Sequence, residues 1–149
     1  MKTFCRLILC SCVVVLVSCT RKYDRPGDAA FELVDALVAA DVDRAKSVTV
    51  SEQWDRIEEW MQKREPFICQ GGTWDGTGIS GSGFRAADNE WDYGAVYQCA
   101  SQRTPYCLRV NDILVRETVD GWKVYDWGSI CEASDYAIGC VELCGPRPR

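Results

Sequence analysis

The stretch Ile113–Gly128, "ILVRETVDGWKVYDWG", has the sequence pattern of a β-hairpin. Two runs rich in β-branched and aromatic residues flank Asp120-Gly121, a dipeptide typical of tight hairpin turns. The first run continues back to Tyr106, which predicts one long strand with a bulge at Asn111-Asp112. "YGAVYQCAS" (93–101) predicts a neighbouring strand. The second half of the chain is therefore expected to form an antiparallel sheet.

The residues before this sheet have the spacing of amphipathic helices. Between 28 and 38, the side chains Phe31, Val34 and Val38 recur on one helical face. Short second and third helices are predicted over 42–48 and 52–64. Three residues of the N-cap type precede the helices: Asp28, Asp41 and Ser51. Helices followed by strands predict an α+β domain, with N-terminal helices packed on a curved antiparallel sheet.

The N-terminal segment has the pattern of a secretory signal peptide. Lys2 and Arg6 precede an uncharged apolar run over 7–17. This run is shorter than the about 20 apolar residues that a membrane-spanning helix needs. Its end, Leu16-Val17-Ser18-Cys19, resembles the lipobox of bacterial lipoproteins: a branched apolar residue, a tolerated position, a small residue and a cysteine. A buried core helix or a short anchor is the alternative interpretation.

The lipobox resemblance implies a division of the chain. A signal peptide over 1–18 would be removed, residues 19–27 would be the lipidated cysteine and a tether, and 28–149 would be a single α+β domain. The Cys19 sulfur would carry diacylglycerol, so that membrane lipid is the expected partner and the bacterial cell envelope the expected location. Two or more acyl chains hold a protein durably to a bilayer. By analogy with lipoprotein sorting, Thr20 after the cysteine favours the outer membrane, facing the periplasm or the surface.

The chain has ten cysteines, and they fall into separate groups. Cys5, Cys10 and Cys12 lie in the predicted signal, and Cys19 is the predicted lipidation site. An even set remains in an exported and oxidising setting, where cysteines form disulfides. These six are Cys69, Cys99, Cys107, Cys131, Cys140 and Cys144. The part of the chain from about residue 131 is thus expected to be a disulfide-stapled C-terminal tail.

One pairing follows from the expected strands. If the turn between them is centred near Arg103, Cys99 and Cys107 lie opposite each other. Opposed residues of antiparallel strands approach disulfide distance, which predicts a Cys99–Cys107 bond. The competing pairings are Cys69–Cys99 and Cys107–Cys131.

Charge and composition argue against several classes of function. The chain has a net charge of −5, and loss of a signal containing Lys2 and Arg6 makes it more negative, which argues against a nucleic-acid partner. There is no histidine, and cysteines in an oxidising setting favour disulfides over zinc, so no metal and no cofactor are expected. The glycine-rich stretch 71–84 lacks the Lys-Ser/Thr of a phosphate loop and predicts a flexible hairpin or bulged edge strand.

Two stretches resemble the nuclear transport factor two-like superfamily, also called SnoaL-like or cystatin-like. "AFELVDALVAADVDRAKSV" (30–48) is similar to its first two helices, and Ile113–Gly128 is similar to its final hairpin. Ala40 stands where the family often has glycine. The resemblance implies a cone-like sheet around a pocket that holds Asp, Tyr, His or Arg in the enzymes of the family. The absence of histidine excludes a His-based mechanism.

Few residues are candidates for chemistry or binding. Asp126 alternates with Trp122 and Val124, so it is a weak candidate for a buried catalytic carboxylate, unless a one-residue shift turns it to water. Three tryptophans are weak candidates for ligand binding: Trp74, Trp91 and Trp122.

Three functions remain open from the sequence. The preferred one is a membrane-anchored lipoprotein that binds an unknown small molecule or envelope protein without catalysis. The alternatives are a small pocket enzyme of the hydrolase or isomerase type, which would use Asp126, and a structural element of the periplasm.

Overall fold

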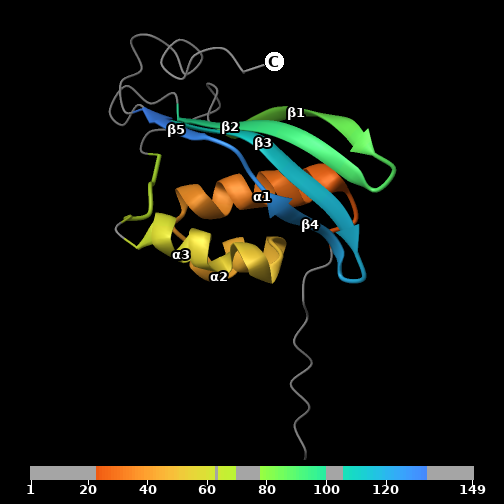
Figure 1. Cartoon of the computed structure of the whole chain (residues 1–149). Coiled ribbons are helices and arrows are strands. Elements are labelled where there is room, and N and C mark those ends of the chain that lie inside the picture. Colours follow the sequence, from red (N-terminus) through yellow and green to blue (C-terminus); the bar gives the residue numbers. More distant parts are fainter. Residues whose placement is uncertain (1–22, 63, 70–77, 100–105, 134–149) are drawn as a thin grey trace, which may run out of the picture.

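The computed structural model describes residues 23–62, 64–69, 78–99 and 106–133. Within this part, helices pack on one face of an antiparallel sheet, as Figure 1 shows, and the predicted α+β class is confirmed. The elements are α1 (Pro26–Val38), α2 (Val42–Val48), the 3-10 turn η1 (Ser51–Gln53), α3 (Trp54–Met61), β1 (Gly78–Ala87), β2 (Glu90–Cys99), β3 (Tyr106–Thr118), β4 (Gly121–Asp126) and β5 (Ile130–Ala133).

The packed domain begins earlier than the expected start at Asp28. Helix α1 starts at Pro26, whose fixed φ and missing N–H suit the first helical turn. Asp28 is therefore not the N-cap; it lies in the first turn, where its carboxylate accepts hydrogen bonds from Arg25 at 3.1 Å. Tyr23 is already buried, and its carbonyl accepts a hydrogen bond from the Trp122 backbone N–H at 3.1 Å.

Helix α1 ends in a Schellman motif. Ala40 adopts the left-handed conformation with a φ of 50°. The Ala40 N–H donates to the Leu37 carbonyl, and the Asp41 N–H donates to the Ala36 carbonyl. Asp41 then caps α2 as predicted, because its carboxylate accepts a hydrogen bond from the Arg44 N–H at 3.0 Å.

The third helix is shorter than the sequence predicts. Ser51 opens the η1 turn, and the α-helix begins only at Trp54 and ends at Met61. Ile57 and Met61 of this helix are both buried in the core, whereas Trp54 at its start is 41% exposed.

The sheet has the strand order β1-β2-β3-β4, and β5 pairs with the first half of β3. The predicted bulge of β3 is confirmed, since Tyr93 pairs with Ile113 whereas Ala95 pairs with Val110. Asp112 has a φ of 51° within this bulge. The bulge bends β3 where its second neighbour changes from β5 to β4.

The β3–β4 hairpin is also confirmed. Its turn joins Thr118 to Gly121, and Gly121 has a φ of 97°, which a residue with a side chain adopts only with strain. The Thr118 hydroxyl donates to the Gly121 carbonyl at 2.6 Å.

The core lies between α1 and the inner face of the sheet. Figure 1 shows α1 running beneath β1, β2 and β3, with α2 and α3 beyond it. The largest fully buried side chains come from α1, α2, α3 and three strands: Leu33, Val34, Leu37, Val48, Ile57, Cys99, Leu108, Val110, Ile113, Val115 and Val124. Branched apolar residues thus occupy the inner face that the family resemblance would assign to a pocket.

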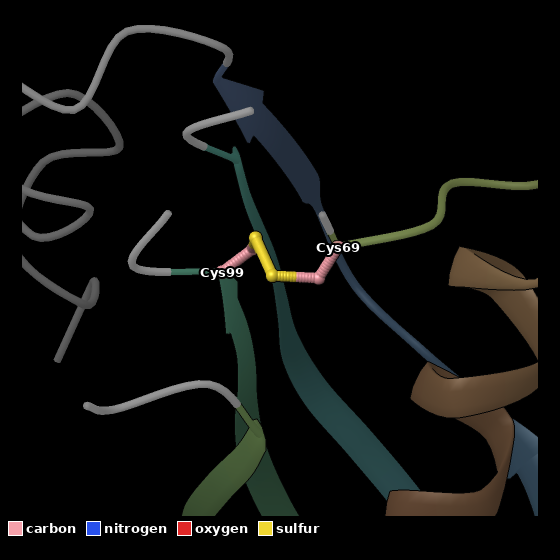
Figure 2. Close-up of a disulfide and its surroundings, with 2 residues drawn as sticks. All are labelled: Cys69 and Cys99. Atoms are coloured by element: carbon pink, nitrogen blue, oxygen red, sulfur yellow. A yellow bond between two sulfur atoms is a disulfide. The ribbon is translucent and has the colours of Figure 1, made fainter. Parts of the chain in front are cut away.

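The disulfide of Cys99 differs from the predicted one. Cys99 is bonded to Cys69, with their Cα atoms 5.7 Å apart (Figure 2). The predicted Cys99–Cys107 bond is wrong because β2 and β3 pair Cys99 with Tyr106 and Gln98 with Cys107. This register is one residue away from the expected one, so the two cysteines point to opposite faces of the sheet. Cys107 and Cys131 each take part in a disulfide as well. Cys140 and Cys144 lie outside the described residues.

Candidate functional site

Among the described residues, the buried set contains no Asp, Glu, Lys or Arg side chain. The buried polar residues there are Thr49 and Asn111. The Thr49 hydroxyl donates to the Ala45 carbonyl at 3.0 Å, and the Asn111 amide donates to the Ser129 hydroxyl at 3.1 Å. Both side chains are therefore satisfied within the fold.

Asp126 lies on the surface. Its alternation with Trp122 and Val124 would have placed it inward as a buried carboxylate. The pairing of β3 with β4 shifts between Leu114 and Val115, so that Tyr125 is an extra residue and the alternation is broken. The Asp126 side chain is 53% exposed and forms a salt bridge with Arg56 at 3.1 Å. The one-residue shift that would turn Asp126 to water is therefore present. In this position the Asp126 carboxylate cannot serve as a base inside a pocket.

The tryptophan candidates do not form one site. Trp91 on β2 stacks on Tyr93 with ring centroids 6.0 Å apart. Trp122 on β4 is half-buried against the core, and β3 separates it from Trp91. Trp74 lies outside the described residues.

A groove runs along the flank of α1 that faces β1. It encloses about 460 Å³ and has Phe31 and Ile79 among its lining residues. Its remaining lining residues are Tyr23, Asp24, Arg25, Asp28, Glu32 and Asp35. This groove was not predicted, although the acids at 28, 32 and 35 have the spacing of one helical face.

The acidic groove, as we call this set of lining residues, contains ion pairs between described residues. Arg25 pairs with Asp28 at 3.1 Å, and Arg44 pairs with Glu32 at 2.9 Å and Asp35 at 2.6 Å. Among the described residues, two arginines therefore pair with three of the four carboxylates that line the groove.

The acids of the groove also affect neighbouring tyrosines on β2. Burial raises the pKa of Tyr93, and the negative charge of Asp28 raises it further. Burial and Asp35 raise the pKa of Tyr97 in the same way. Both phenols therefore stay protonated and neutral beside the groove.

Strand β1 borders the acidic groove and forms an edge of the sheet. Among the described strands, β1 pairs only with β2, so its other edge has no strand partner there. Ser80, Gly81, Ser82 and Gly83 are all exposed. The strand predicted for the glycine-rich stretch 71–84 is thus confirmed over its described part, residues 78–84, which belong to β1. Residues 71–77 lie outside the described part of the chain.

A second polar cluster joins the end of α3 to β5. Arg64 holds both carboxylate oxygens of Glu132, and the Tyr106 hydroxyl donates to Glu132 at 2.6 Å. Arg64 also lies 3.6 Å above the Trp60 ring, and Phe67 stacks on Tyr106. The hydrogen bonds from Arg64 lower the pKa of Glu132, whereas burial raises the pKa of Tyr106. These mutually satisfied groups form a structural clasp.

The described residues contain no group of three or more His, Cys, Asp or Glu side chains placed to hold a metal ion. Nor does any helix among them have the length and apolar character needed to cross a membrane. No protein-family model, curated protein or solved structure matches the chain.

Proposed function

We propose that this chain is a lipid-anchored lipoprotein of the bacterial cell envelope, and that its α+β domain is a non-catalytic interaction module. The observation that carries the second part is the apolar interior. Every charged side chain among the described residues lies outside the buried set. Interaction through the surface is the function that such a packed domain supports best.

The position of Tyr23 supports an anchor immediately before the domain. Tyr23 is buried and hydrogen-bonded next to the β3–β4 turn. Cys19 precedes it by four residues, which span at most about 14 Å. Acylation of Cys19 would therefore hold the β3–β4 end of the sheet near the bilayer, on the periplasmic or surface side of the outer membrane where the host has one.

A pocket enzyme is the weaker proposal. It would need a carboxylate inside a cavity, where desolvation raises its pKa. Asp126 instead pairs with Arg56 on the surface.

Metabolic labelling tests the anchor. Cells that express the full chain and take up an alkyne analogue of palmitate should label the wild-type protein. Cys19→Ser should lose the label and retain residues 1–18, because the thiolate is the acylated group. Cys12→Ser is the matched control inside the signal and should label normally. A Cys19→Ser protein that is labelled and processed like the wild type would contradict the lipoprotein proposal.

A further inference from the structure

Two exposed apolar side chains lie at the end of the sheet where the chain enters the domain. Val119 is in the β3–β4 turn, which projects from that end (Figure 1), and its side chain is 95% exposed. Trp54 begins α3 and is 41% exposed. Turn positions favour glycine, proline, asparagine, aspartate and serine. A β-branched apolar residue at this tip is therefore not explained by the turn itself.

A groove connects Trp54 with the turn. It encloses about 420 Å³, and its lining includes Trp54 together with Thr118 and Asp120, the two neighbours of Val119. The chain before η1 is fixed against β4 here by a backbone hydrogen bond of 3.0 Å. Val119 and Trp54 therefore belong to one surface, which we call the tip surface.

The path of the chain into the domain places the tip surface beside the proposed anchor. Tyr23 is buried and forms a parallel bridge with Gly121. Four residues lead from Cys19 to Tyr23 and span at most about 14 Å, and Val119 is two residues from Gly121, or at most about 7 Å. Acyl chains on Cys19 would lie in the bilayer. The tip surface would then stay within reach of the lipid.

Weak contacts are enough to orient a domain that is already tethered. A short tether makes the contact intramolecular and gives it a high effective concentration. Tryptophan suits the boundary between headgroups and acyl chains, because its ring is apolar and its N–H is polar. The exposed acids at this end, Glu52, Glu117 and Asp120, favour a zwitterionic lipid surface over an anionic one.

We propose that the tip surface contacts a bilayer of zwitterionic lipid, with Val119 inserted between the lipids and the Trp54 ring at the level of the headgroups. This inference rests on the proposed anchor at Cys19 and adds the orientation of the domain. The disulfide end of the sheet then points away from the membrane. Ile68 is 73% exposed beside Cys69 at that end, and it should stay in water.

Quenching of tryptophan fluorescence by brominated lipid tests the contact. The mature chain from residue 19 is coupled through its Cys19 thiol to phosphatidylcholine vesicles that contain a maleimide lipid, with or without bromine on the acyl chains. We expect the fluorescence of the wild type to fall on brominated vesicles, and Trp54→Phe to lose most of that fall. Because the anchor is imposed chemically, a failure here would refute the contact alone, whereas failure of the metabolic labelling would refute the anchor in cells.

Two matched variants test the role of Val119. Val119→Asp places a charge at the tip, where burial in lipid is unfavourable, and should reduce the quenching at least about 2-fold. Ile68→Asp makes the same change at the disulfide end and should leave the quenching unchanged. Equal quenching in both variants, or no quenching of the wild type, would overturn the proposal. So would a Trp54 signal that changes with the density of coupled chains and not with bromine, because it would assign the tip surface to a second copy.

Discussion

Ala40 holds a backbone conformation that suits glycine better than any other residue. Its φ of 50° closes the Schellman motif at the end of α1. A left-handed conformation costs a residue with a Cβ roughly 1–2 kcal/mol. The same turn positions Asp41 to cap α2, and this hydrogen bond offsets part of the strain.

The first prediction concerns this residue. Ala40→Gly should raise the free energy of unfolding by up to about 1 kcal/mol, because the relief of strain exceeds the added flexibility of the unfolded chain. Urea denaturation with disulfides intact measures the change. Ala39→Gly is the control, since Ala39 has a right-handed φ of −75°, and it should destabilise the domain. Equal destabilisation by the two variants would contradict the strain assigned to Ala40.

The Arg64–Glu132–Tyr106 clasp makes a residue-scale prediction about pH. The pKa of Glu132 is lowered by Arg64, so the clasp stabilises the fold above the pKa that the unfolded chain gives this carboxyl, and the stabilisation is lost as pH falls through the folded value. Glu132→Gln should cost about 1 kcal/mol at pH 7, with partial exposure keeping the loss small. The difference from the wild type should shrink between about pH 5 and pH 3.

Unfolding midpoints across that pH range measure this dependence. Glu59→Gln provides the control, because Glu59 is exposed on α3 outside the clasp. A difference between wild type and Glu132→Gln that stays constant down to pH 3 would show that charge on Glu132 contributes nothing.

At the scale of elements, features set by residues close in sequence were predicted correctly, whereas the pairing of β2 with β3 was not. The β3–β4 hairpin, the bulge at Asn111-Asp112 and the cap at Asp41 each depend on residues close in sequence, and each was predicted. The relative register of β2 and β3 depends on a connection whose sequence, "QRTP", does not specify the turn. One residue of error there moved Cys99 and Cys107 to opposite faces.

A one-residue shift also explains why the expected position of Asp126 was uncertain. Asp126 follows an extra residue in β4 that no local motif marks, so alternation predicted the wrong face. The acidic groove depends on α1 and β1 lying side by side, although 39 residues separate their ends at Val38 and Gly78. The helical spacing of the acids was visible in the sequence. The position of the glycine-rich strand beside this helix was not, because it depends on contacts between residues far apart in the chain.

The disulfides make a prediction at this scale. Cys69–Cys99 joins the segment after α3 to β2. Cys107 on β3 and Cys131 on β5 each form a disulfide. They do not lie directly opposite each other, because Cys107 pairs with Ala133 and Cys131 pairs with Arg109, so we expect their partners to be Cys140 and Cys144 of the tail. Non-reducing peptide mapping should return a Cys69–Cys99 peptide and peptides that link each of the other two strands to the tail. A Cys99–Cys107 peptide would contradict the register of the sheet.

At the scale of the whole molecule, the two ends of the sheet have different roles in this account. Tyr23 and the β3–β4 turn lie at one end, where the proposed anchor would emerge. Cys99, Cys107 and Cys131 lie toward the other end, on β2, β3 and β5. The proposed anchor and the disulfides therefore lie at opposite ends of the sheet.

The mass of the mature N-terminal peptide, isolated from native membranes, tests the anchored module most directly. The account predicts a peptide that begins at Cys19 and carries a diacylglycerol group on its sulfur, with or without an acyl chain on the new amine. A mature chain that begins elsewhere, or one that begins at Cys19 with a free thiol, would contradict it.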